Sequence, residues 1–171
     1  SRGLGDVYKR QDVNSKVCFN SNVAASVPTR KFIKLKMKEF ENHYFIGQVV
    51  NELRSIYLGA PYEYKIEYNF RNVTDKIYQD GRLRFFCNVP KWMEFLNDSD
   101  LTFGSRLHGN IAAVLAGTPA LLVTKDSRTR ELAEYHHLNA IHESKLNEKL
   151  TLQDLVEQQD FTQIEKYQKQ N

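Results

Sequence analysis

The sequence predicts an α/β fold in which helices cover both faces of a Rossmann-like parallel sheet. Two observations lead to this prediction. Short apolar runs typical of buried strands alternate with segments whose apolar residues recur at helical spacing, and the connections between them are short. Strands that alternate with helices in this way form a parallel sheet, because each helix crosses one face of the sheet to reach the next strand.

The first half of the chain carries the weaker pattern. A first strand is expected at residues 16–19, where it closes into an Asn- and Ser-rich loop at residues 20–22. Polar and apolar residues alternate over residues 31–37, which predicts a second strand with one solvent-exposed face. Apolar residues at helical spacing over residues 49–57 stop before a Gly and a Pro, which predicts a helix. Residues 62–80 show no firm period, and we assign them no structure.

The second half carries a clearer pattern. The turn at residues 104–109 joins a short strand to an Ala-rich helix that begins near Asn110. Another helix begins at Pro90, and Asp126 or Ser127 caps a third. Four strands are expected, at residues 83–89, 101–103, 120–124 and 139–141.

One α/β domain is expected at residues 12–150. Residues 1–11 have no clear period and resemble translated adaptor sequence, so we expect a non-native or disordered leader and a chain that lacks a natural N-terminal part. Residues 151–171 have the pattern of a C-terminal amphipathic helical tail.

Length and composition are those of a globular protein. The 171 residues are 41% hydrophobic and 26% charged, which excludes wholesale disorder and the collagen-like, disulfide-rich and low-complexity classes. No apolar run approaches the length of about 18 residues that a membrane span needs. Lys and Arg number 24 against 21 Asp and Glu, and this small excess is spread along the chain, so no nucleic-acid partner is expected. Cys18 and Cys87 lie far apart in apolar runs, and we expect buried thiols in a reducing compartment.

The turn at residues 104–109 is the strongest candidate for an anion site. In parallel sheets, ligands bind where a strand leads into a helix, whose N-terminal N–H groups and positive dipole attract anions. Arg106 can grip a carboxylate or phosphate, and His108 can transfer a proton near neutral pH. Asp126 and Arg128 follow the next strand and are placed to add charged groups to the same edge of the sheet.

Each of these residues also has a purely structural interpretation. An Arg near a helix start is commonly a surface residue, a lone His is commonly held by structural hydrogen bonds, and Asp126 can serve as a helix cap alone. The chain contains no zinc-ligand spacing, no Walker phosphate loop and no dinucleotide Gly fingerprint. We therefore expect neither a metal nor a bound cofactor.

A resemblance to a known family lies in residues 104–132, which have the sequence GSRLHGNIAAVLAGTPALLVTKDSRTREL. Together with WMEFL (92–96) and DLTF (100–103), they resemble the C-terminal half of the polysaccharide pyruvyl transferase family. The resemblance is specific because several elements occur together, whereas each element alone would be weak evidence for the family. The elements are, in order, Ser-Arg-Leu-His-Gly, an Ala-rich helix, Ala-Gly-Thr-Pro, a strand and Asp-Ser-Arg. The resemblance extends over residues 82–138 and, more loosely, over residues 16–57, where FIGQ is also similar.

The resemblance implies a glycosyltransferase B-like fold of which this chain supplies the C-terminal Rossmann-like half. It implies an enzyme that moves the pyruvyl (1-carboxyethylidene) group of phosphoenolpyruvate, the donor substrate, onto two hydroxyls of a sugar, forming a ketal and releasing phosphate. Arg106 and His108 match the family's motif and are the implied catalytic residues. The resemblance implies that Arg106 binds the carboxylate or phosphate of the donor, and that His108 protonates the enol carbon or eases the departure of phosphate. Substrate-binding positions are expected at Ser105, Gly109, Asn110, Asp126 and Arg128.

The expected partners are phosphoenolpyruvate and a sugar or glycan acceptor, in the synthesis of an exopolysaccharide of the cell envelope. The acceptor-binding N-terminal half is expected to be missing from this chain. A cytoplasmic location, free or at the membrane periphery, follows from the intracellular donor and the free thiols. Two alternatives stay open: a nucleotide-sugar-dependent glycosyltransferase-like domain, and a noncatalytic glycan-binding or assembly module.

Overall fold

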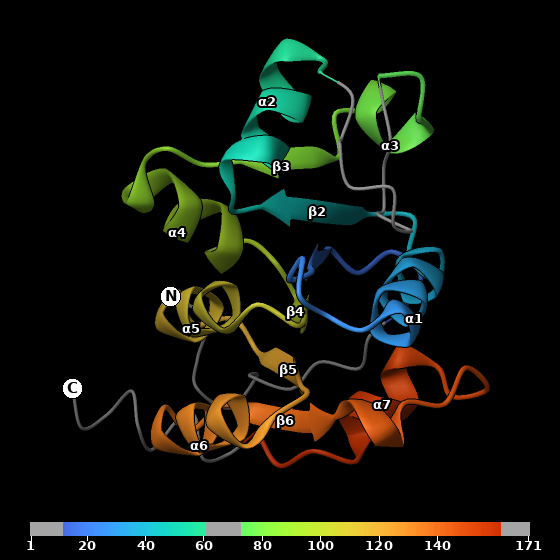
Figure 1. Cartoon of the computed structure of the whole chain (residues 1–171), viewed down its shortest axis with the longest axis vertical. Coiled ribbons are helices and arrows are strands. Elements are labelled where there is room, and N and C mark those ends of the chain that lie inside the picture. The colour runs from blue at the N-terminus through green and yellow to red at the C-terminus, as the bar shows by residue number, and fades with distance from the viewer. Residues whose placement is uncertain (1–11, 61–72, 162–171) are drawn as a thin grey trace.

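A computed structural model describes residues 12–60 and 73–161 of the chain. Six parallel strands form one sheet in the order β3-β2-β1-β4-β5-β6 (Figure 1). A parallel sheet whose first strand lies beside its fourth has the Rossmann-like arrangement, so the predicted fold class is confirmed. The strands are β1 (Val17–Asn20), β2 (His43–Gly47), β3 (Leu83–Phe85), β4 (Leu101–Gly104), β5 (Ala120–Thr124) and β6 (Asn139–His142).

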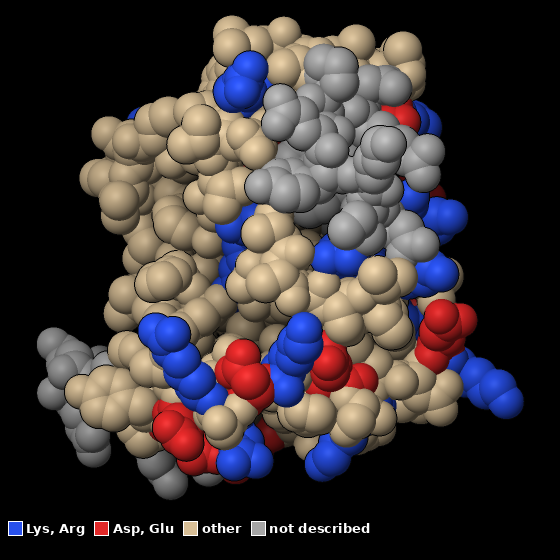
Figure 2. Space-filling model, viewed as in Figure 1, with Lys and Arg blue, Asp and Glu red and all other residues tan. Residues whose placement is uncertain are grey.

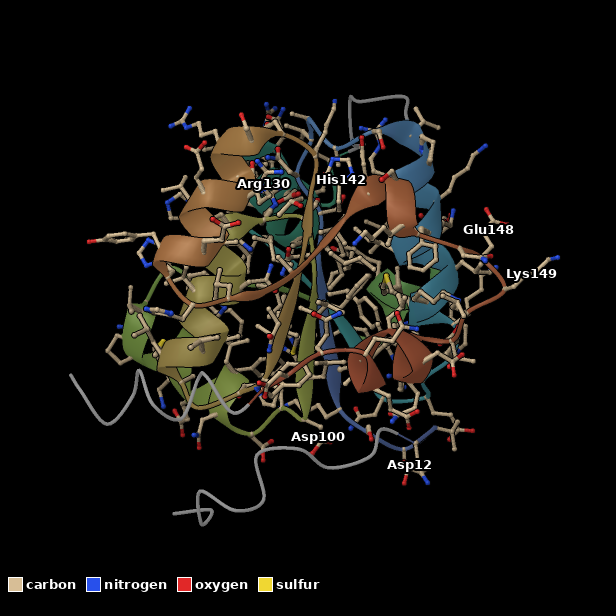
Figure 3. The ribbon with its side chains drawn as sticks, turned by 90° about the horizontal axis from the view of Figure 1, so that it is seen from below. Asp12, Asp100, Arg130, His142, Glu148 and Lys149 are labelled. Carbon is tan, nitrogen blue, oxygen red and sulfur yellow. The ribbon has the colours of Figure 1, made fainter. Side chains whose placement is uncertain are left out.

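Helices cover both faces of this sheet. They are α1 (Val27–Met37), α2 (Val50–Leu58), α3 (Lys76–Gln79), α4 (Val89–Asn97), α5 (Leu107–Leu115), α6 (Ser127–Tyr135) and α7 (Leu152–Glu157), with a short 3-10 helix at Glu143–Lys145. Helices α1 and α7 lie on one side of the sheet, and α4, α5 and α6 lie on the other (Figure 1). Figure 3 shows the same two helical layers from below, with the strands between them.

The middle of the sheet is the most deeply buried part of the molecule. Every residue of β1, β4 and β5 is buried, because helices pack on both faces. Phe19 of β1 and Phe103 of β4 meet edge to face, with their ring centroids 6.2 Å apart. Helix α5 packs on β4 and β5 and buries Ala112 and Ala113 there. The strand ends that carry the predicted site are therefore held by a continuous core.

The predicted strand at residues 31–37 is wrong, because these residues belong to α1. Ser26 caps this helix by accepting a hydrogen bond from the backbone N–H three residues later (3.3 Å), and a Pro occupies the first turn. The alternating sequence also fits a helical period. Ile33 and Met37 are buried together, whereas Leu35, which a strand would place on their side, is 38% exposed.

One further strand and two boundaries differ from the sequence-based expectation. Strand β2 is not predicted, and its first two residues are only partly buried, unlike those of a central strand. The strand expected at residues 83–89 ends at Phe85, because Asn88 caps α4 by accepting a hydrogen bond from a backbone N–H of its first turn (3.1 Å). Helix α5 begins at Leu107, inside the predicted turn.

The two cysteines occupy different environments. Cys18 lies in β1 and is fully buried, as predicted, and burial raises the pKa of its thiol to about 11. Cys87 follows β3 and is exposed, so the prediction that both thiols are buried is wrong. The reason is topological, since β3 is an edge strand and ends two residues before Cys87.

Helix α7 attaches the C-terminal region to the domain. Its residues Leu152 and Leu155 are fully buried, and the backbone N–H of Leu152 donates a hydrogen bond to Oε2 of Glu39 (2.8 Å). The first part of the predicted amphipathic tail therefore packs on the core through its apolar face.

Three predicted regions fall wholly or partly outside the described residues. These are the leader at residues 1–11, residues 62–72 of the unassigned region, and residues 162–171 of the tail. None of the helices that the structure describes combines the length and apolar character of a membrane span.

Charged side chains of both signs lie side by side on the face of the molecule drawn in Figure 2. Lys and Arg are interleaved with Asp and Glu over the lower part of this view, where Figure 1 places α6 and α7.

Candidate functional site

The carboxyl ends of β1 and β4 meet where the strand order of the sheet reverses. Asn20, the last residue of β1, is in register with Gly104, the last residue of β4. The chain leaves β1 toward α1 on one face and leaves β4 toward α5 on the other (Figure 1). Open α/β sheets bind their ligands at this kind of position. The predicted turn with Arg106 and His108 lies here.

Gly104 allows the two strand ends to touch. A Cβ on this residue would collide with the carbonyl oxygen of Asn20 and would lie 2.7 Å from its Cγ, a space that only glycine leaves open. The loops after the two strands are consequently bonded to each other. The N–H of Arg106 donates to Oδ1 of Asn20 (2.8 Å), and the N–H of Asn22 donates to Oγ of Ser105 (2.8 Å). Ser105 is thus placed at the predicted site, while its binding of a substrate stays a prediction.

Arg106 is buried between these loops. It is the N-cap residue of α5 and is 8% exposed. Its Nε donates to the carbonyl oxygen of Ser21 (2.6 Å), and its Nη2 forms an ion pair with Oε1 of Glu52 (2.6 Å). The guanidinium thereby joins the loop after β1, the start of α2 and the end of β4. Its expected contact with a donor substrate stays a prediction.

Glu52 links the guanidinium of Arg106 to the N-terminus of α2. It is fully buried, and its Oε2 accepts hydrogen bonds from the backbone N–H groups of Gln48 (2.5 Å) and Val49 (3.0 Å). Burial raises the pKa of Glu52 above its ordinary value, while the charge of Arg106 and the two N–H groups oppose this rise. When ionised, Glu52 balances the positive charge of Arg106 within the protein.

His108 lies in the first turn of α5 and is exposed. No hydrogen bond or ion pair engages its imidazole within the part of the chain that the structure describes. The first turn of α5 contains no acidic residue, so its N–H groups face no carboxylate from the helix itself. No group of three or more His, Cys, Asp or Glu residues that could hold a metal ion occurs in residues 12–60 and 73–161. An exposed imidazole beside a helix N-terminus suits proton transfer to a bound anion.

Gly109 and Asn110 shape the base of this turn. Asn110 is fully buried, and its Nδ2 donates to the carbonyl oxygens of Arg106 (2.8 Å) and of the last residue of β4 (3.3 Å). It therefore fixes the backbone of the turn, and its role in substrate binding stays a prediction. Gly109 is buried, and a Cβ on it would collide with Nε2 of Gln48 and lie 3.2 Å from Nδ2 of Asn20.

Asp126 and Arg128 lie after β5, the neighbour of β4. Asp126 caps α6, as predicted: its Oδ1 accepts hydrogen bonds from the N–H and the hydroxyl of Thr129 (both 2.7 Å), and these bonds lower the pKa of its carboxyl group. Arg128 is exposed in the first turn of α6. Within the described residues neither side chain bonds to the turn of Arg106 and His108, so a role for them in substrate binding stays a prediction.

A carboxylate of the protein bonds to side chains at the start of α1. Oε2 of Glu143, which follows β6, accepts hydrogen bonds from Oγ of Ser26 (2.6 Å) and Oγ1 of Thr29 (2.8 Å). Burial alone would raise the pKa of Glu143, but these two hydrogen bonds and the nearby Lys125 and His142 together outweigh it, and the net shift is downward. Helices α1 and α5 both begin at the strand-order reversal, and only α5 lacks such a carboxylate among the described residues.

Asn20, Gln48 and Glu52 belong to the site but are not among the residues predicted for it. The signal for Asn20 is its place in an Asn- and Ser-rich loop directly after a buried strand. Gln48 and Glu52 follow β2, and without a predicted strand there is no strand end to draw attention to them. The contacts of all three depend on which strands lie side by side.

The family model of polysaccharide pyruvyl transferase matches residues 57–127. This segment contains α4, β4, α5 and β5, and therefore the turn with Arg106 and His108. The match confirms the resemblance expected from the sequence, and the matched family is one of transferases. No curated protein matches the chain.

A solved structure is similar to this chain in fold. It is a crystal structure of the glycotransferase of kitacinnamycin, with a TM-score of 0.50 and 12% sequence identity. The alignment covers 99% of this chain and 41% of that one, so this chain spans less than half the length of its structural neighbour. At this identity the similarity concerns the fold, and it supports a glycosyltransferase-type α/β architecture.

Proposed function

We propose that this chain is the C-terminal half of a polysaccharide pyruvyl transferase, which moves the pyruvyl group of phosphoenolpyruvate onto two hydroxyls of a sugar or glycan. One observation carries the proposal: the family match includes the turn that opens α5 at the strand-order reversal. The segment with the specific sequence motif thus lies at the kind of position where open α/β sheets generally bind their ligands, which supports the proposal. The products would be a cyclic ketal and inorganic phosphate.

The first turn of α5 supports the proposed binding of the anionic donor. Phosphoenolpyruvate carries a carboxylate and a phosphate, and helix N-termini stabilise such groups through free N–H donors and the helix dipole. We place the donor over this turn, beside the exposed His108. Arg106, the buried N-cap residue of α5, adds a positive charge, which its ion pair with Glu52 reduces.

The proposed reaction begins with protonation of the terminal enol carbon of phosphoenolpyruvate. His108 is the proposed acid, because an imidazole can donate a proton to a bound substrate and this ring is exposed in the first turn of α5. Protonation leaves an oxocarbenium-like centre at C2, which one sugar hydroxyl attacks. The C2–O bond to phosphate then breaks and the second hydroxyl attacks the same carbon. Of the two hydroxyl protons released, one returns to His108 and the other leaves with inorganic phosphate. The N–H donors of α5 stabilise the negative charge of the departing phosphate.

Ligand-dependent thermal unfolding tests the proposed donor with this chain alone. The unfolding midpoint is measured with phosphoenolpyruvate, with a uridine diphosphate sugar and with inorganic phosphate. A ligand at a hundred times its Kd stabilises a protein by about 2.7 kcal/mol, which raises the midpoint of a domain of this size by about 5–10 °C. We expect the largest rise with phosphoenolpyruvate. His108→Ala should reduce this rise, since the exposed imidazole can be removed without disturbing the core.

His136→Ala is the matched control, because His136 ends α6 and lies outside the candidate site. Its midpoint should rise with phosphoenolpyruvate as in the wild type. A rise with the nucleotide sugar and none with phosphoenolpyruvate would contradict the proposal and favour a nucleotide-sugar-dependent domain. An equal rise in wild type and His108→Ala would remove His108 from the donor site.

We further propose that the acceptor is bound with the help of an N-terminal lobe that this chain does not include. The share of the glycosyltransferase-type neighbour that this chain spans, 41%, is consistent with one of two lobes. The proposed donor is an intracellular metabolite, which favours a cytoplasmic location for the complete enzyme. The description of the matched family favours a role in polysaccharide synthesis, which we propose to be that of an exopolysaccharide. Phosphate release from phosphoenolpyruvate by a longer form of the protein, with candidate glycans added, would test this part.

A further inference from the structure

The side-chain amide of Asn20 presents an N–H donor over the first turn of α5. Asn20 is 2% exposed. One hydrogen bond distinguishes the oxygen of its side-chain amide from the nitrogen, because the group that accepts the backbone N–H of Arg106 (2.8 Å) must be the oxygen, Oδ1; an amide nitrogen is a donor and cannot accept. Its Nδ2 lies 3.2 Å from the position that a Cβ on Gly109 would take. Within the described residues no acceptor bonds to this nitrogen.

Gln48 brings a second amide to the same place. Its Nε2 would collide with a Cβ on Gly109, so it lies directly against the backbone of this turn. The nitrogen is buried, and among residues 12–60 and 73–161 it has no hydrogen-bond partner. Folded proteins rarely leave a buried donor without an acceptor, because the group has lost its hydration and gained nothing in return.

The backbone of α5 adds further donors. The N–H groups of Leu107, His108 and Gly109 open the helix, and no acceptor for them lies within the part of the chain that the structure describes. No protein carboxylate bonds to this helix end there, in contrast to the start of α1, where the hydroxyls of Ser26 and Thr29 donate to Glu143. Donors from the ends of β1 and β2 and from the start of α5 thus converge on Gly109.

We propose that Asn20 and Gln48 are ligand-binding residues whose amide groups hold a phosphoryl group against the first turn of α5. A phosphoryl group has three terminal oxygens and accepts several N–H bonds at once, which suits donors that arrive from three segments. Arg106 then acts as the brace that fixes the orientation of Asn20 through its backbone N–H. The inference rests on the proposed function only for the identity of the ligand, which would be phosphoenolpyruvate.

The test measures the affinity of this chain for inorganic phosphate and for phosphoenolpyruvate by calorimetric titration. Asn20→Asp keeps the oxygen that accepts the N–H of Arg106 and replaces the donor with a negatively charged oxygen. Gln48→Leu removes the second donor at similar size. Asn88→Asp is the matched control, because Asn88 also accepts a backbone N–H as a helix cap but lies after the edge strand β3.

We expect Asn20→Asp to weaken the binding of both anions at least tenfold, Gln48→Leu to weaken it severalfold, and Asn88→Asp to leave it unchanged. Gln48→Leu should unfold at the same or a higher temperature than the wild type, since it removes an unpaired buried donor. A purely structural Gln48 would instead lower the midpoint. Loss of stability with unchanged affinity in Gln48→Leu would overturn the inference, even if Asn20→Asp fails to fold.

The two proposals fail in distinguishable ways. Binding of phosphoenolpyruvate that neither Asn20→Asp nor Gln48→Leu weakens would overturn the inference and leave the proposed function intact. Binding of inorganic phosphate that both variants weaken, without binding of phosphoenolpyruvate, would support the inference and contradict the proposed donor. A wild-type chain that binds neither anion would overturn the inference.

Discussion

Removal of Arg106 should destabilise the protein strongly, because it leaves a carboxylate buried without its partner. Glu52 is fully buried and lies 2.6 Å from Nη2 of Arg106. Loss of one member of a buried ion pair costs about 3–5 kcal/mol, since the remaining charge has neither water nor a counter-charge. At about 2–4 °C per kcal/mol for a domain of this size, Arg106→Met should unfold roughly 6–20 °C below the wild type.

A double-mutant cycle separates the ion pair from the other contacts of Arg106. Glu52→Leu alone should also be costly, because it leaves the guanidinium buried beside an apolar side chain. The double variant carries neither charge, so it should be more stable than the sum of the single losses predicts. Free energies of unfolding in urea for the four proteins give the coupling. Single losses below about 1 kcal/mol, or additive losses in the double variant, would refute this reasoning.

The cost of Arg106→Met should also depend on pH. Burial raises the pKa of Glu52, and without Arg106 that pKa rises further, because the charge that opposes the rise is gone. A group with a raised folded-state pKa contributes stability below its unfolded pKa, and this contribution is lost as the pH rises through the folded pKa. The deficit of Arg106→Met should therefore be smallest at acid pH and grow toward neutral pH. A deficit that stays constant over that range would contradict the assigned role of Glu52.

Two further predictions concern the thiols and the contact between β1 and β4. A thiol reagent should label Cys87 in the folded protein and Cys18 only on unfolding. The reason is that Cys87 is exposed, whereas Cys18 is buried and its thiol has a pKa of about 11. Rapid labelling of both thiols in the folded protein would contradict the structure. Gly104→Ala should lower the free energy of unfolding, measured in urea, by about 1–3 kcal/mol or more. The added methyl group collides with the backbone carbonyl of Asn20, which cannot rotate away as a side chain could. An unchanged free energy of unfolding would show that the strand ends separate without cost.

The region from β4 to β6 could be predicted from sequence because local signals agree there. A short apolar run, a turn and an Ala-rich helix follow one another in β4 and α5, and Asp126 caps α6 with its own side chain. Local signals conflict in α1, whose alternating residues fit a strand while its Ser cap and Pro fit a helix start. The helix forms because Ile33 and Met37 are buried together on one face.

The sequence by itself determined the α/β class, the turn that carries Arg106 and His108, and the resemblance to a pyruvyl transferase family, because each of these depends on residues close together in the chain. Only the tertiary structure decided what surrounds that turn. The N–H of Arg106 bonds to Asn20 across 86 positions, and its guanidinium pairs with Glu52 across 54. Such contacts depend on the placement of β1 between β2 and β4. No local sequence pattern encodes this placement, because it is set by the packing of the whole sheet.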